Sequence, residues 1–239
     1  MAYSQEKPRL TVAVASNFYY PLTQILNNQR FDFDVRLVTA SSGVLYAQAL
    51  NGAPFDIFLS ADKKRPESLS AKNLSTAPWR YALGKLVLYP SKPNESIDTI
   101  ITNAKRIAIA NETSAPYGLA AAQVLGSVLV NRAKIVQGNN VAQAFQFADS
   151  GNADVAFVAE SMVIQAYKQS QNAKYLTFQS VNSTLHTPIE QFGVVLQKSK
   201  LKKEAAIFKD FLLSCTSQIQ LNKLGYQTDL SQITHKEGC

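Results

Sequence analysis

The sequence predicts an α/β fold whose sheets are mostly parallel and flanked by helices on both faces. Three observations predict it. Strand-like and helix-like segments alternate along the chain, the alternation starts again after residue 90, and small polar residues stand where strands give way to helices. Strands that alternate with helices pair in parallel through right-handed crossovers, so their helices cover both faces of the sheet.

The first third of the chain predicts three units of strand and helix. Each strand segment is rich in apolar residues, many of them β-branched or aromatic, and the helix segments repeat apolar residues at helical spacing. Pro21 is acceptable in the first turn of its helix, and Asp62 is expected to cap the third helix. The expected strands are 9–15, 33–40 and 55–62, and the expected helices are 18–29, 43–51 and a segment that contains Glu67 and Leu69.

The same alternation predicts the rest of the chain. Gly151 is expected to end one of the helices, and no low-complexity linker or tandem repeat separates independent domains. The expected strands are 106–111, 133–138, 153–159 and 192–197, and the expected helices are 118–130, 139–151, 203–214 and 216–226.

The composition excludes a membrane span and gives no sign of a nucleic-acid surface. Of the 239 residues, 46% are hydrophobic and 17% are charged, and no apolar run approaches the ~20 residues of a transmembrane helix. The formal charge of +7 is scattered, without a dense basic stripe interleaved with aromatic residues. We expect no nucleic-acid partner and a mild steering of anionic ligands.

Cysteine and histidine are too scarce to predict a metal site. Cys215 and Cys239 have no C-x-x-C spacing, and His186 and His235 are the two histidines. A disulfide between the two cysteines is one alternative, and an unpaired thiol at Cys239 is the other. We expect no metal ion ligated directly by the protein and no cofactor.

Small residues rich in hydrogen-bond donors follow the expected strands at four junctions. These read ASN from Ala15, TASSGV from Thr39, SAPYGL from Ser114 and GNNVAQ from Gly138, and none contains an arginine or a lysine. Apart from Glu112 at the edge of the third, they also lack carboxylates. Ligands of open α/β sheets bind at such carboxyl ends, close to helix N-termini that attract anions.

Two interpretations of these junctions compete. Each serine or asparagine taken alone is most simply an ordinary helix cap. Four such turns in one layout favour a small dehydrated oxyanion that is held by hydroxyl and backbone N–H groups.

Five longer motifs resemble those of the periplasmic molybdate-binding proteins of ABC importers. They are AVASNF, TASSGVLYAQALNGAPFDIFLSAD, APYGLAAAQVL, NNVAQAFQFADSGNADVAFVA and PIEQFGVVL, in the order and spacing of that family. The resemblance extends from about residue 9 to residue 226, and the block SSGxLxxQxxNGAPxDxFxSAD at 41–62 is its most distinctive part.

The resemblance implies a two-lobed periplasmic-binding-protein fold of type II. Each lobe would have a mostly parallel sheet flanked by helices, and the ligand would lie in the cleft between the lobes. Lobe one is expected at residues 1–84 plus 192–239, and lobe two at residues 85–191.

The same resemblance implies a transport function. The protein would capture molybdate, and also tungstate, through neutral hydrogen-bond donors and deliver it to a membrane-embedded ABC permease. A protein with this function is expected to be a monomer in the periplasm. The opening MAYSQEKPRL has no apolar segment, so we expect that a signal peptide has been removed. A lipid-anchored native form stays open beside a freely soluble one.

Five residues match the oxyanion-binding positions of the family. Ser16 resembles the hydroxyl donor of the first lobe, and Asn17 beside it would give its backbone N–H. Ser42 would donate through both its hydroxyl and its N–H group. Tyr117 and Val141 would donate backbone N–H groups from two helix starts of the second lobe.

One position departs from part of the family, and several residues have a structural alternative. Ala159 stands where some relatives have a tyrosine hydroxyl, so that contact cannot form. Without the resemblance, Tyr117 is a turn aromatic and Val141 a packing residue. Asp56 and Asp62 are expected to have structural roles, as a carboxylate that stabilises the lobe and as a helix cap, and not to form a catalytic pair.

Three other functions are weighed. A binding protein for sulfate is the first alternative, because sulfate is also a tetrahedral dianion that accepts from donors alone. A serine-dependent enzyme is less favoured, because the chain has no G-x-S-x-G motif. An effector domain of a transcription regulator is disfavoured, because the first strand begins near Leu10 and leaves no room for a helix-turn-helix before it.

Overall fold

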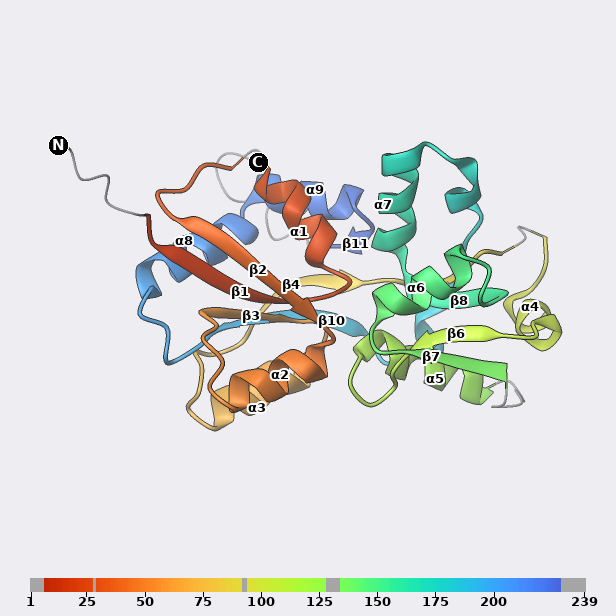
Figure 1. Ribbon diagram of the computed structural model, residues 1–239, viewed down its shortest axis with the longest axis horizontal. Helices are drawn as coiled ribbons and strands as arrows, with labels where there is room; N and C mark the ends of the chain where they lie inside the picture. Colours follow the sequence, from red (N-terminus) through yellow and green to blue (C-terminus); the bar gives the residue numbers. More distant parts are fainter. Residues whose placement is uncertain (1–6, 28, 92–93, 128–133, 229–239) are drawn as a thin grey trace.

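Two β-sheets lie side by side in the computed structural model, which describes residues 7–27, 29–91, 94–127 and 134–228 (Figure 1). Helices flank each sheet, and buried apolar clusters fill the space between sheets and helices. We call the two halves lobe one and lobe two. The two-lobed α/β fold class is therefore confirmed. The expectation of mostly parallel sheets is wrong, because both sheets mix parallel and antiparallel pairs.

The sheet of lobe one combines a parallel centre with antiparallel additions. Its strands are β1 (Arg9–Ala15), β2 (Asp34–Ala40), β3 (Ile57–Ser60), β4 (Trp79–Gly84), β10 (Ile189–Val195) and β11 (Tyr226–Gln227). Their order in the sheet is β11-β4-β10-β3-β1-β2. β1 pairs in parallel with β2 and β3, whereas β10 is antiparallel to β3 and β4.

Helices cover both faces of this sheet. Figure 1 shows α1, α8 and α9 over one face and α2 and α3 over the other. Leu22 and Phe208 are buried in the cluster on the first face, and Leu45 and Leu69 in the cluster on the second. The helices are α1 (Tyr19–Leu26), α2 (Ser42–Leu50), α3 (Lys64–Ala71), α8 (Lys202–Leu212) and α9 (Cys215–Lys223).

Lobe two has a second mixed sheet. Its strands are β5 (Leu86–Tyr89), β6 (Ile107–Ala110), β7 (Ile135–Gly138), β8 (Val155–Ala159) and β9 (Gln179–Ser180), in the order β7-β6-β8-β5-β9. β6 pairs in parallel with β7 and β8, and β5 is antiparallel to β8 and β9. The helices are α4 (Ile97–Asn103), α5 (Pro116–Ser127), α6 (Val141–Asp149) and α7 (Glu160–Ser170).

The chain passes between the lobes through short connections. Lys85 alone separates β4 of lobe one from β5 of lobe two, and β10 brings the chain back after β9. β10 already pairs with β4 at Ile189, so the return precedes the expected residue 192. This division of strands agrees with the limit at residue 84 and places the second limit before residue 189, and the lobe limits stay a proposal.

Several elements differ from the sequence expectations. α7 was not expected, because it follows β8 directly at Glu160 without a polar turn to announce it. α5 begins at Pro116 and not at Gly118, which agrees with the preference of proline for the first helical position. The end of that expected helix, at 128–130, lies outside the described residues. In the described ranges, no helix has the length and apolar character that crossing a bilayer requires.

Candidate functional site

The turn after β1 carries Ser16 and Asn17 to the carboxyl edge of the first sheet. The Ser16 N–H donates to the carbonyl of Ala40 at 3.0 Å, which places this turn beside the end of β2. Phe18 is the N-cap residue of α1, and no side chain caps that helix. The interpretation of Ser16 and Asn17 as ordinary helix caps is therefore wrong.

Asn17 is held in place by buried partners from distant parts of the chain. Its side-chain amide donates to Gln191 Oε1 at 3.0 Å and to the Tyr226 hydroxyl at 2.9 Å. Its carbonyl accepts from Tyr226 at 2.9 Å and from Ser161 of lobe two at 3.3 Å. Because the side-chain amide donates both of its hydrogen bonds within the protein, the backbone N–H is the donor of Asn17 that can serve a ligand.

Ser42 is the first residue of α2, and its hydroxyl is oriented by the backbone. Its Oγ accepts the N–H of Ala61, at the end of β3, at 3.0 Å. Ser42 is only 1% exposed. Since Ala61 supplies a proton to this oxygen, the hydroxyl keeps its own proton for another acceptor. The N–H of Ser42 also lies in the first turn, where helical N–H groups have no acceptor within the helix.

Ser41 adds a second buried hydroxyl that sequence analysis did not select. It is the N-cap residue of α2, yet its side chain makes no capping bond. Its Oγ has no hydrogen-bond partner among the described residues. Buried polar groups are normally paired, so an unpaired hydroxyl beside Ser42 indicates a place for a polar ligand.

Tyr117 lies in the first turn of α5, with its side chain turned away into the region between the lobes. The residue is buried, and its hydroxyl has no hydrogen-bond partner among the described residues. This oxygen packs so closely on Gly84, the last residue of β4, that a Cβ there would overlap it. The side chain thus packs at the strand that leads out of lobe one, and the first-turn N–H has no acceptor within the helix.

Val141 is the first residue of α6, which has a reciprocal cap. Asn140 accepts the N–H of Gln143 at 3.0 Å, and Gln143 accepts the N–H of Asn139 at 2.7 Å. The N–H groups of Asn139 and Gln143 thereby find acceptors, and the N–H of Val141 takes part in neither bond. That N–H keeps the freedom to donate, while the Val141 side chain packs in the core as its structural alternative predicts.

The structure brings residues next to these positions into one buried cluster across the lobes. One apolar cluster contains Ala15 and Ala61 of lobe one, which lie next to Ser16 and Ser42. The same cluster contains Tyr117, Val141 and Ala159 of lobe two. The helices that begin there, α1, α2, α5 and α6, all have at least eight residues. Their positive N-terminal ends favour an anion.

Two hydrogen bonds join the lobes next to this region. The N–H of Gly43 donates to the carbonyl of Ser114 at 2.7 Å. Nη2 of Arg65 donates to the carbonyl of Thr113 at 2.9 Å. Both acceptors lie in the turn between β6 and α5, so this short segment is a second interlobe contact beside that of Ser161 with Asn17.

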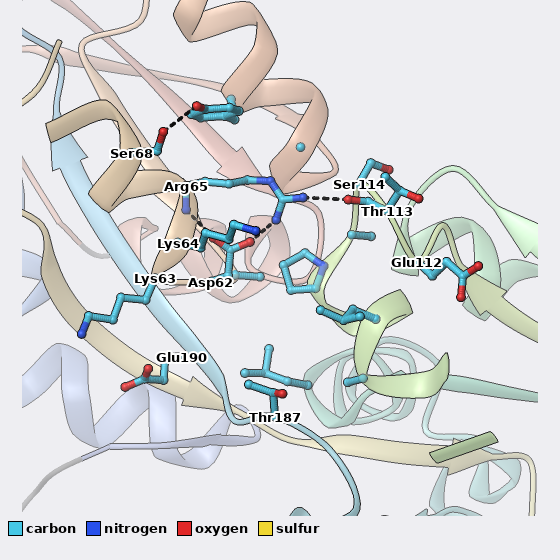
Figure 2. Close-up of a pocket in the computed structure, with 18 of the residues that line it drawn as sticks. Asp62, Lys63, Lys64, Arg65, Ser68, Glu112, Thr113, Ser114, Thr187 and Glu190 are labelled. Carbon is cyan, nitrogen blue, oxygen red and sulfur yellow. Dashed lines mark hydrogen bonds and ion pairs between the residues drawn. The ribbon is translucent and has the colours of Figure 1, made fainter. Parts of the chain in front are cut away.

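A cavity of about 820 Å³ lies between the lobes, next to these two hydrogen bonds (Figure 2). α2, α3, the start of α5 and residues 187–190 line it, and Arg65 and Thr113 meet at its wall. None of the five predicted site residues lines this cavity. Its lining mixes acidic and basic side chains, so it lacks the neutral donor set that the predicted residues share.

Asp56 and Asp62 both bond to the protein itself, and Asp62 does so from the residue before Lys63, the N-cap residue of α3. Asp56 accepts from the Thr11 N–H at 2.7 Å and from the Ser199 hydroxyl at 2.6 Å, which ties β1 to the segment after β10. Asp62 accepts the N–H of Arg65 in the first turn of α3 at 2.9 Å. Among the described residues, no group of three or more His, Cys, Asp or Glu side chains could hold a metal ion. Cys239 and His235 lie outside the described residues.

Burial raises the pKa of three tyrosines near the interlobe region. Tyr81, Tyr117 and Tyr226 all have a pKa above the ordinary value of 10.0, mainly because desolvation disfavours the phenolate. In the unfolded chain these groups lose their protons near pH 10, whereas the folded protein keeps them bound. Their contribution to stability is complete below pH 10 and is lost as the pH rises above it.

We therefore expect the free energy of unfolding to fall above pH 10, by ~1.4 kcal/mol per pH unit for each such tyrosine. Urea titrations between pH 9 and pH 11 measure this slope. Tyr226→Phe removes one of the three groups and should make the fall less steep. An identical slope in the variant would contradict the assignment of the loss to the buried tyrosines.

Comparison with known proteins decides the family. The profile of the family described as bacterial extracellular solute-binding protein matches residues 10–227. This chain belongs to that family. Its resemblance to the molybdate-binding proteins is also confirmed, because curated relatives of that name match nearly the whole chain.

The relatives are similar in sequence and in structure. The molybdate-binding protein ModA of Azotobacter vinelandii is 36% identical over 237 residues, which cover 95% of this chain and 92% of the relative. ModA of Rhodobacter capsulatus is 35% identical over 227 residues, covering 91% of this chain and 87% of the relative. The solved periplasmic molybdate-binding protein of Azotobacter vinelandii has a TM-score of 0.83 at 31% identity, covering 92% of this chain and 99% of that one.

Proposed function

We propose that this chain is an extracytoplasmic solute-binding protein that captures molybdate or tungstate between its lobes and delivers it to an ABC permease. The observation that carries the proposal is the buried Ser42 hydroxyl, whose oxygen accepts from Ala61 and whose proton is free for an anion. The relatives named molybdate-binding protein support this choice of ligand.

The proposed site uses donors from both lobes. Ser16 and Ser42 supply hydroxyl groups, and Asn17, Tyr117 and Val141 supply backbone N–H groups. The metal enters as an oxyanion, so these residues bind its oxygens and none ligates molybdenum or tungsten directly. The N-terminal ends of the helices add a favourable electrostatic potential without a formal positive charge.

A donor-only set selects among anions. At neutral pH molybdate and tungstate are dianions that only accept hydrogen bonds, whereas a protonated phosphate also needs an acceptor. No side-chain carboxylate belongs to the proposed set. Sulfate satisfies the same donors, and the curated relatives favour molybdate over it.

The binding of the ion is proposed to favour the closed arrangement of the lobes. Donors from each lobe contact the same anion, so the ion binds the closed form better than the open one and shifts the equilibrium towards it. The closed protein, a periplasmic monomer, would then dock on the membrane-embedded permease. The chain acts as a carrier in this proposal and not as an enzyme.

Calorimetric titration of the dialysed protein with molybdate, tungstate, sulfate and phosphate tests the proposal. We expect tight binding of molybdate and tungstate and at least a ~100-fold weaker response to sulfate and phosphate. Sulfate binding as tight as that of molybdate would keep the oxyanion site and overturn the ligand. Absence of binding to all four anions would overturn the oxyanion site itself.

A further inference from the structure

Arg65 bridges the two lobes from a position that is fixed within lobe one. It lies in the first turn of α3, and its side chain is 19% exposed. Nη1 pairs with one oxygen of Asp62, whose other oxygen accepts the Arg65 backbone N–H at 2.9 Å. A guanidinium that is held at two points loses little further freedom when it makes a third contact.

The third contact crosses the cleft. Nη2 donates to the carbonyl of Thr113 at 2.9 Å, as Figure 2 shows at the wall of the cavity. The next carbonyl, that of Ser114, accepts the N–H of Gly43. Two successive carbonyls of lobe two are therefore held by two separate elements of lobe one.

The segment that Arg65 holds leads directly to a proposed donor. Asn111 Oδ1 accepts from the N–H groups of Thr113 and Ser114 at 3.0 and 2.9 Å and from the Ser114 hydroxyl at 3.1 Å. This turn is consequently a fixed unit, and α5 begins two residues after it at Pro116. The Arg65 bond sets the place of the Tyr117 N–H relative to lobe one.

The neighbouring cations of α3 make no equivalent contact. Lys63 pairs with Glu67 on its own helix at 3.2 Å, with half of each side chain exposed, and Lys64 is exposed as well. Arg65 is thus the residue of this basic run that reaches the other lobe. Its bond exists while the lobes are together and is lost when they separate, so it acts on ligand release more than on capture.

We infer that Arg65 is a positioning residue that retains the bound oxyanion, by holding the 111–114 turn and hence α5 against lobe one. The inference rests on the proposed function, since it assumes an anion between the lobes. Arg65→Met is expected to speed dissociation of the anion by about tenfold, the effect of losing one charge-assisted hydrogen bond, and to change the association rate less than about twofold.

Release of radiolabelled molybdate into an excess of unlabelled molybdate measures the dissociation rate, and rapid filtration measures the association rate. Arg65→Lys keeps the positive charge but lacks the forked donors of the guanidinium. Its dissociation rate should lie between those of Arg65→Met and the unchanged protein. Arg36→Met, at an exposed position of β2, is the matched control and should leave both rates unchanged.

The two failures are distinguishable. If Arg65→Met releases molybdate as slowly as the unchanged protein does, this inference is overturned and the proposed function still stands. An equal change in both rates would also overturn it, because a general loss of structure would produce that result. Failure of the unchanged protein to retain any molybdate would overturn the proposed function and this inference with it.

Discussion

Gly43→Ala is expected to weaken molybdate binding by about a hundredfold while the ligand-free protein stays folded. A Cβ at Gly43 would lie 2.8 Å from both the Cα and the carbonyl oxygen of Ser114, which are backbone atoms of the other lobe. The lobes would have to move apart to admit it, and the Gly43 hydrogen bond to Ser114 would be lost. Within lobe one, alanine is the better helix former, so α2 itself should not suffer.

Calorimetry and thermal unfolding of the ligand-free protein test this expectation together. Gly126→Ala is the matched control, because Gly126 is also a helical glycine and a Cβ there meets nothing within 4 Å. We expect both variants to unfold close to the temperature of the unchanged protein, and the control alone to bind normally. Binding by Gly43→Ala within about threefold of the unchanged protein would show that close contact at Ser114 is not needed.

Ser42→Ala is expected to weaken molybdate binding by between ~10-fold and ~100-fold, because a hydrogen bond to a charged group contributes ~1.5–3 kcal/mol. The substitution has a second effect on stability. It leaves the buried N–H of Ala61 without its acceptor, which should lower the free energy of unfolding by ~1–3 kcal/mol even without ligand.

Titration with molybdate and urea unfolding of the ligand-free variant separate the two effects. Ser183→Ala, at an exposed serine of lobe two, serves as the control and should alter neither quantity. A loss of stability without a loss of affinity would mean that the Ser42 hydroxyl only supports Ala61. That result would remove Ser42 from the proposed site.

The alternation of strands and helices could be predicted because its signals are local. β1 and β2 lie almost at their expected limits, as the β-branched and apolar residues between Arg9 and Ala40 indicate. The antiparallel position of β10 between β3 and β4 is different, because it depends on where the chain returns from lobe two. A local pattern carries no information about such a return.

In the candidate site, too, local sequence signals predict some residues, and contacts between distant segments decide the others. Ser42 is recognisable from the SSG block around it, but its partner Ala61 directly follows β3, 19 residues away. The contact of Arg65 with Thr113 joins residues 48 apart and ends on a backbone carbonyl, which no residue type reveals. Capping was the natural interpretation of Asn17, and only the folded chain shows its side chain engaged elsewhere.

The bond between Asn17 and Tyr226 spans 209 residues and has a consequence for biosynthesis. The ribosome makes the Ser16–Asn17 turn 209 residues before Tyr226, the partner that fixes this turn. A nascent chain that has not reached Tyr226 thus carries Ser16 and Asn17 without the hydrogen bond that fixes their turn. The proposed anion site can then be completed only after Tyr226 has been made.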